Sequence, residues 1–103
     1  MNLNLLVLRC KDIELSKSFY SKLGIDFVVE QHGSGPKHYS SSINDCVLEL
    51  YPIKENECID NIRLGFKNTN TPKELLLSAT NYNLNGKTVY LIKDPDGRTV
   101  ELG

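Results

Sequence analysis

A single turn near the C-terminus constrains the fold more than any other part of the sequence. It is Asp-Pro-Asp-Gly at 94–97, in which Pro95 presets φ for a turn position and Gly97 accepts a positive φ at little steric cost. The segments on either side, 88–92 and 99–102, have the β-branched and apolar composition of strands. The sequence therefore predicts a β-hairpin at the end of the chain.

The second strand of this hairpin carries a carboxylate. Thr99 and Glu101 share one face of the strand, and Val100 and Leu102 share the other, because successive side chains alternate. Most glutamates at such positions are solvated edge residues, and spacing alone favours that interpretation of Glu101. The alternative is a functional carboxylate that faces a cavity.

Composition and charge exclude several classes of function. The chain has 103 residues, enough for one small domain with one core. The net charge is −1 and basic residues do not cluster, so nucleic-acid binding has no electrostatic support. No apolar run approaches the length of a membrane span, and the N-terminus lacks the features of a signal peptide. We therefore expect a cytoplasmic protein that binds neither nucleic acid nor membrane.

The remaining sequence forms two similar halves. The predicted elements, in order, are a strand at 2–10, a helix capped by Asp12 and stopped by Gly24, strands at 25–30, 37–43, 46–51 and 61–67, a helix at 72–80, and the final hairpin. In the first helix we expect Leu15, Phe19 and Leu23, with Tyr20 beside them, to form the buried stripe.

This element order predicts one α+β domain, 1–103, made of two modules at about 1–53 and 59–103. Each half opens with a strand-to-helix step and closes on a strand that bears Val, Glu and Leu, at 47–50 and at 100–102. The second half is shorter, and 81–86 has a turn-rich composition, so we expect an abbreviated second module in which one strand is vestigial.

Both ends of the chain resemble one known superfamily. Segment 5–12, followed by Phe19-Tyr20 and Leu23-Gly24, resembles the opening of glyoxalase/bleomycin-resistance/extradiol-dioxygenase proteins, also called vicinal oxygen chelate proteins. Asp94-Pro95-Asp96-Gly97, followed by 100–102, resembles their closing motif. The resemblance covers essentially the whole chain. It implies a pair of βαβββ modules whose curved sheets enclose a cavity.

The resemblance also implies where a metal would bind. Metal-dependent members hold the ion at an early position of each module's first strand and at a carboxylate of each module's last strand. Those positions fall on Leu5, Glu49, Asn61 and Glu101. The histidines usual on the first strands are missing here, whether the second position is Asn61 or its neighbour Ile62. Because transition metals favour imidazole or thiolate beside carboxylate, we expect no metal cofactor at this set.

The two histidines of the chain lie elsewhere. His32 and His38 fall near the loop after the second predicted strand, and we expect each to be a solvated loop residue. A displaced metal ligand at either position remains the alternative, so a divalent metal stays possible.

Strand alternation and the resemblance together give a candidate ligand-binding set. Its members are Arg9, Glu49, Tyr51, Asn61, Arg63 and Glu101. The arginines can hold a carboxylate or phosphate in bidentate fashion, and Tyr51 can stack or donate a hydrogen bond. Equally, Arg9 or Arg63 can form structural salt bridges with Glu49 or Glu101.

Three functions fit these residues. The first is a small-molecule binding protein, similar to the antibiotic-binding branch, without a conventional metal site. The second is a metal-dependent lyase, isomerase or dioxygenase with an unconventional ligand set, in which Glu49 and Glu101 are the catalytic candidates. The third is a structural or interaction protein, since one fold hosts many functions. Whether the chain is an enzyme is left open.

We expect a homodimer. The resemblance implies that cavities of this kind are often completed by modules from two chains. A short second module also leaves a sheet edge and apolar surface to cover. Whether the cavity forms within one chain or between two is left open at this stage.

Overall fold

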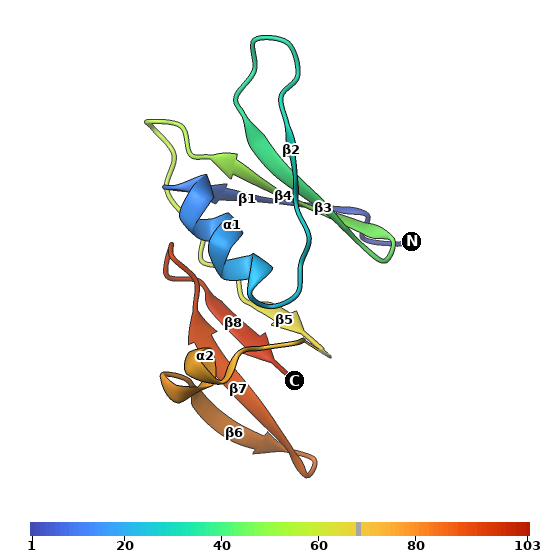
Figure 1. Cartoon of the computed structure of the whole chain (residues 1–103), viewed down its shortest axis with the longest axis vertical. Coiled ribbons are helices and arrows are strands. Elements are labelled where there is room, and N and C mark those ends of the chain that lie inside the picture. Colours follow the sequence, from blue (N-terminus) through green and yellow to red (C-terminus); the bar gives the residue numbers. More distant parts are fainter. Residues whose placement is uncertain (68) are drawn as a thin grey trace.

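The computed structural model describes residues 1–67 and 69–103, which form two modules of the same topology (Figure 1). The first contains β1 (Leu5–Cys10), α1 (Ile13–Ser21), β2 (Val28–Glu30), β3 (His38–Ile43) and β4 (Cys46–Pro52). The second contains β5 (Leu64–Phe66), α2 (Lys73–Leu77), β6 (Thr80–Leu84), β7 (Lys87–Lys93) and β8 (Thr99–Leu102). The predicted α+β fold of paired βαβββ modules is confirmed.

Each module builds one four-stranded sheet, in the orders β1-β4-β3-β2 and β5-β8-β7-β6. The first and last strands of each module run parallel, and the remaining neighbours are antiparallel. A parallel pair made by the first and last strands of a module needs a crossover connection between them. In each module the helix and the two middle strands supply this connection.

The second module is shorter, as predicted, but it retains all four strands. Its helix has five residues against nine in α1. The expectation of a vestigial strand is wrong because segment 81–86, which has a turn-rich composition, contains most of β6. This strand is exposed along its length, so it lacks an apolar alternation. Its pairing with β7 is set instead by the Asn85-Gly86 turn, where both residues have positive φ, as in a type I′ hairpin.

Helix α1 begins as predicted and buries part of the predicted stripe, with Tyr20 and, just after the helix, Leu23 in the core. Asp12 caps it by accepting hydrogen bonds from the backbone N–H groups two and three residues later, at 2.9 and 3.2 Å. Leu15, expected in the buried stripe, is 58% exposed, while Ser16 and Tyr20 are buried. The helix is rotated toward these polar residues because both make hydrogen bonds to the turn between β7 and β8.

Most of the buried apolar side chains form one cluster that spans both modules. It comprises Leu8, Cys10, Tyr20, Leu23, Ile25, Tyr39, Leu48, Leu50, Ile92, Val100 and Leu102. The ring of Tyr20 on α1 contacts the ring of Phe66 on β5, with centroids 6.3 Å apart. Figure 1 shows the modules stacked along the long axis of a molecule of 49 × 29 × 25 Å. Among the described residues, no helix combines the length and apolarity that a membrane crossing would need.

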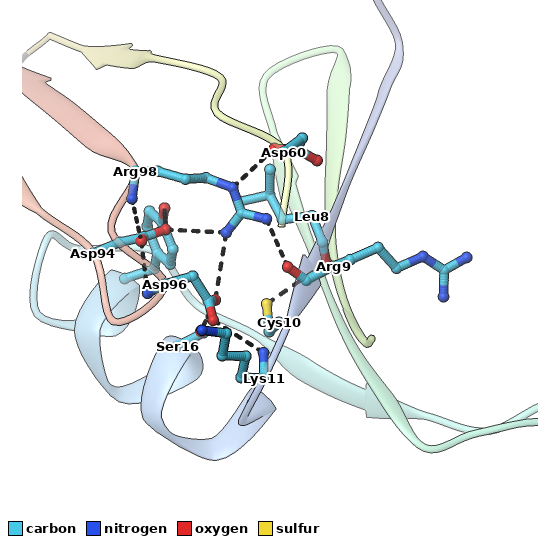
Figure 2. A network of polar contacts seen from close by, with 10 residues as sticks. Leu8, Arg9, Cys10, Lys11, Ser16, Asp60, Asp94, Asp96 and Arg98 are labelled. Carbon is cyan, nitrogen blue, oxygen red and sulfur yellow. Dashed lines mark hydrogen bonds and ion pairs between the residues drawn. The ribbon is translucent and has the colours of Figure 1, made fainter. Parts of the chain in front are cut away.

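A buried polar network joins the modules (Figure 2). Its centre is Arg98, which follows the turn between β7 and β8. The side chain of Arg98 is fully buried. The guanidinium donates to the carboxylates of Asp94 at 3.2 Å and Asp60 at 3.1 Å, and to the backbone carbonyl of Arg9 on β1 at 2.6 Å. Burial acts to lower the pKa of Arg98, and the hydrogen bonds to Asp60 and Asp94 outweigh it, so the pKa is raised.

The two aspartates of the turn bind the first module. The hydroxyl of Tyr20 donates to Asp94 at 2.7 Å, and the backbone N–H of Lys11 donates to Asp96 at 3.0 Å. Burial, together with the hydrogen bond to Asp94, raises the pKa of Tyr20. The turn that the sequence analysis identified as a hairpin signal thus also fastens β8 to β1 and α1.

Candidate functional site

The first candidate surface is the side of the first sheet that faces away from α1. In the register of β1 and β4, Val7 is opposite Glu49 and Arg9 is opposite Tyr51. In β3, Ser40 is opposite Glu49. Because opposite residues share a face, these side chains project from the same side of the sheet. We call this side the Glu49 face, and it brings together Arg9, Glu49 and Tyr51 as predicted.

The Glu49 face is centred on His38, which is 1% exposed. Its Nε2 atom lies 3.3 Å from Glu30 Oε1, 3.7 Å from Glu49 Oε2 and 3.2 Å from the hydroxyl of Tyr51. The imidazole also stacks on the Tyr51 ring, with centroids 4.0 Å apart and planes inclined by 11°. The expectation of a solvated His38 is wrong because this residue begins β3 and pairs with Glu30 of β2.

The second ring nitrogen of His38 fixes its orientation. Nδ1 lies 3.2 Å from the carbonyl oxygen of Pro36. A carbonyl oxygen only accepts, so Nδ1 carries the proton and donates it. The imidazole therefore presents Nε2 to the carboxylates of Glu30 and Glu49.

His32 is exposed, as predicted, yet it lies beside His38. The two imidazole centroids are 5.2 Å apart. A turn in the loop between β2 and β3 brings them together: the N–H of Gly35 donates to the carbonyl of His32 at 2.9 Å, and Gly33 adopts a φ of +59°. One ligand atom from each of Glu30, His32 and His38 lies within 4.8 Å of the others. These residues can hold a metal ion.

Arg9 contacts Tyr51. The guanidinium carbon of Arg9 lies 5.0 Å from the Tyr51 ring centroid, and Nη1 lies 3.5 Å from the carbonyl of Pro52. This is a cation–π contact, so Tyr51 is held between the guanidinium of Arg9 and the imidazole of His38.

A second polar group lies on the other sheet. Arg63 forms an ion pair with Glu101, whose Oε1 also accepts a hydrogen bond from the hydroxyl of Tyr82 at 3.2 Å. The structural salt bridge that we weighed for Arg63 is therefore present. Tyr82 was missed because it lies on β6, the strand that the sequence analysis did not predict.

Asn61 does not lie on a strand, which corrects the predicted ligand position. It is exposed and precedes β5 by three residues. Glu49 is opposite Val7, two residues after Leu5, and Glu101 is opposite Gly65, two residues after Arg63. The internal repeat therefore makes Arg63, and not Asn61, the counterpart of Leu5. The alternation of apolar residues from Ile62 onward had extended the predicted strand too far toward the N-terminus.

The predicted set thus divides into two groups. Arg9, Glu49 and Tyr51 gather around His38 on the first sheet, whereas Arg63 and Glu101 gather with Tyr82 on the second. His32 and His38 are functional candidates that the sequence analysis had placed in a solvated loop. The signal that could have identified them is the sequence Glu30-Gln31-His32 followed by His38 across a Gly-rich loop.

No protein-family model matches the sequence, and none of the curated proteins is similar to it at a significant level. Solved structures do resemble the model. The antibiotic binding protein TnmS3 from Streptomyces is 18% identical with a TM-score of 0.70, over 100% of this chain and 94% of that one. The oxidase ChaP-H2 is 16% identical with a TM-score of 0.69, over 99% and 91%. A possible glyoxalase from Bacillus cereus is 15% identical with a TM-score of 0.63, over 99% and 97%. The chain therefore has the vicinal oxygen chelate fold of glyoxalase and bleomycin-resistance proteins.

Proposed function

We propose that this protein binds a small organic molecule against the Glu49 face. The observation that carries the proposal is the arrangement of Tyr51, whose ring lies between the guanidinium of Arg9 and the imidazole of His38. Small-molecule sites combine aromatic walls with a few placed polar groups, and this face offers both. Likeness in fold to an antibiotic binding protein supports the same function.

We further propose that two copies of the chain enclose the ligand. Apolar side chains are exposed on both outward faces: Leu5 and Val28 on the Glu49 face, and Tyr82 and Leu84 on the side of the second sheet that carries Glu101. Covering such surface is favourable, at roughly 25 cal/mol per Å² of apolar area. A homodimer would turn two open faces into an enclosed cavity.

Light scattering should therefore give a dimer mass for the wild type at micromolar concentration. Leu84→Glu places a charge on the apolar surface and should shift the mass toward the monomer. Leu77→Glu is the matched control, because Leu77 is exposed on α2, away from both outward faces. A monomer mass for the wild type at all concentrations would contradict the homodimer.

A second candidate function is a metal-dependent lyase, isomerase or dioxygenase in which Glu49 is a ligand or base. One observation favours it: the Glu49 carboxylate lies 3.7 Å from the imidazole nitrogen of His38. A carboxylate beside an imidazole is a frequent metal-binding pair.

A thermal-shift screen of a diverse metabolite and drug library tests the binding function. A ligand that binds the folded state should raise the melting temperature of the wild type. The shift should shrink in Tyr51→Leu and persist in Tyr90→Leu, since Tyr90 is opposite Leu102 and projects from the core side of the second sheet. If every hit stabilises the Tyr51→Leu variant as much as the wild type, the ligand does not bind at the Glu49 face.

A further inference from the structure

We propose that Glu30, His32 and His38, with Glu49 beside them, form a binding site for a divalent transition metal. The expectation of no metal rested on Leu5 and Asn61 as the neighbours of the two carboxylates. The fold instead brings the imidazole of His38, on β3, to Glu49, and the imidazole of His32, in the loop before β3, to His38. This site lies on the Glu49 face but does not depend on the proposed function, because metal binding is measured without any organic ligand.

The distances suit a metal ion. Glu30 and His38 are directly opposite each other in the pairing of β2 and β3, and their ligand atoms are 3.3 Å apart. Bonds of about 2.1 Å in tetrahedral geometry separate two donors by roughly 3.4 Å. The third donor, from His32, lies within 4.8 Å of the other two. Because His32 is exposed in the loop, its side chain can move the remaining distance toward the ion.

His38 has the outer contacts of a metal ligand. The N–H at Nδ1 donates to the carbonyl of Pro36, which leaves the lone pair on Nε2, at 3.2 Å from the hydroxyl of Tyr51. Histidines that bind metals usually donate their other ring N–H in this way. Nε2 lies 3.3 Å from the carboxylate of Glu30 and 3.7 Å from that of Glu49, and electron-rich atoms this close to one another attract a cation.

The position of His32 favours the metal. The imidazole centroids of His32 and His38 are 5.2 Å apart, so one metal ion can use both rings as donors. Two imidazoles with carboxylate oxygens suit Zn²⁺ and similar transition metals better than Mg²⁺ or Ca²⁺, which take oxygen ligands.

The experiment is a chelator-buffered calorimetric titration with Zn²⁺ alone, on protein stripped of metal, in a Cys58→Ser background that removes an exposed thiol. We expect one Zn²⁺ per chain. His32→Ala and Glu30→Gln should each weaken binding at least tenfold, equivalent to about 1.4 kcal/mol. His32→Ala is the decisive variant because His32 is exposed and its loss should leave the fold intact.

Two controls separate this site from adventitious binding. Glu55→Gln makes the same charge change at an exposed glutamate in the loop after β4, and it should leave the affinity unchanged. Ca²⁺ in place of Zn²⁺ should bind at least tenfold more weakly. Absence of Zn²⁺ binding by the folded wild type, or equal affinity in His32→Ala, would overturn the proposal. Neither result would bear on the ligand screen, which reports through Tyr51.

Discussion

Replacement of Arg98 by alanine is expected to lower the free energy of unfolding by about 3–5 kcal/mol, the cost of removing one partner of a buried ion pair. The side chains of both Arg98 and Asp94 are fully buried. Without the guanidinium, the carboxylates of Asp94 and Asp96 stay desolvated with like charges close together, and the carbonyl of Arg9 loses its donor. Small domains are stable by about 5–15 kcal/mol, so a loss of this size removes much of the total stability. Urea denaturation at low temperature, where the variant is best kept folded, is therefore the suitable measurement of the free energy of unfolding.

Two further variants show whether buried charge is the cause. Arg63→Ala removes a half-exposed ion pair with Glu101 and should cost no more than about 1 kcal/mol. Arg98→Lys keeps the charge but loses the planar fork, so its cost should fall between those of the two alanine variants. Should Arg98→Ala lose no more stability than Arg63→Ala, the network of Figure 2 does not stabilise the junction of the modules.

The second large effect is expected in the core. Leu8 lies on β1 with 0% exposure and belongs to the cluster that spans both modules. Leu8→Ala removes apolar contacts and leaves a cavity, at a cost of about 2–5 kcal/mol. The free energy of unfolding from denaturant titration measures this loss directly.

Leu15→Ala is the matched control, because it makes the same chemical change at a side chain that is 58% exposed. It should change the stability by no more than about 0.5 kcal/mol, and alanine's helix propensity offsets part of any loss. A loss at Leu15 as large as that at Leu8 would support the original prediction that Leu15 lies in the buried stripe, against the structure.

Local sequence signals were sufficient for much of the fold. The Asp-Pro-Asp-Gly turn predicted the hairpin of β7 and β8, and the alternation around Glu49 predicted which side chains of β4 share a face. Both depend on residues that are neighbours in the sequence, where period and turn chemistry act directly. The same is true of the Asp12 cap.

The remaining features depend on pairing between distant segments. His38 is buried because β3 places it opposite Glu30 and next to Tyr51, which no local pattern of a polar strand can indicate. Arg63 replaces Asn61 as the counterpart of Leu5 because β5 is in register with β8, 36 residues later. Strand register therefore limited the prediction of the candidate site more than residue chemistry did.

The junction network also bears on how fast the chain can fold. Its contacts close long loops: Arg98 reaches Arg9 across 89 residues, Asp96 reaches Lys11 across 85, and Asp94 reaches Tyr20 across 74. Closing such loops costs conformational entropy before the contacts form and offset that cost. Topologies of this kind therefore fold slowly. During synthesis the first module emerges well before its partners on the turn between β7 and β8. The hydroxyl of Tyr20 on α1 therefore stays without this partner until the turn between β7 and β8 has been made.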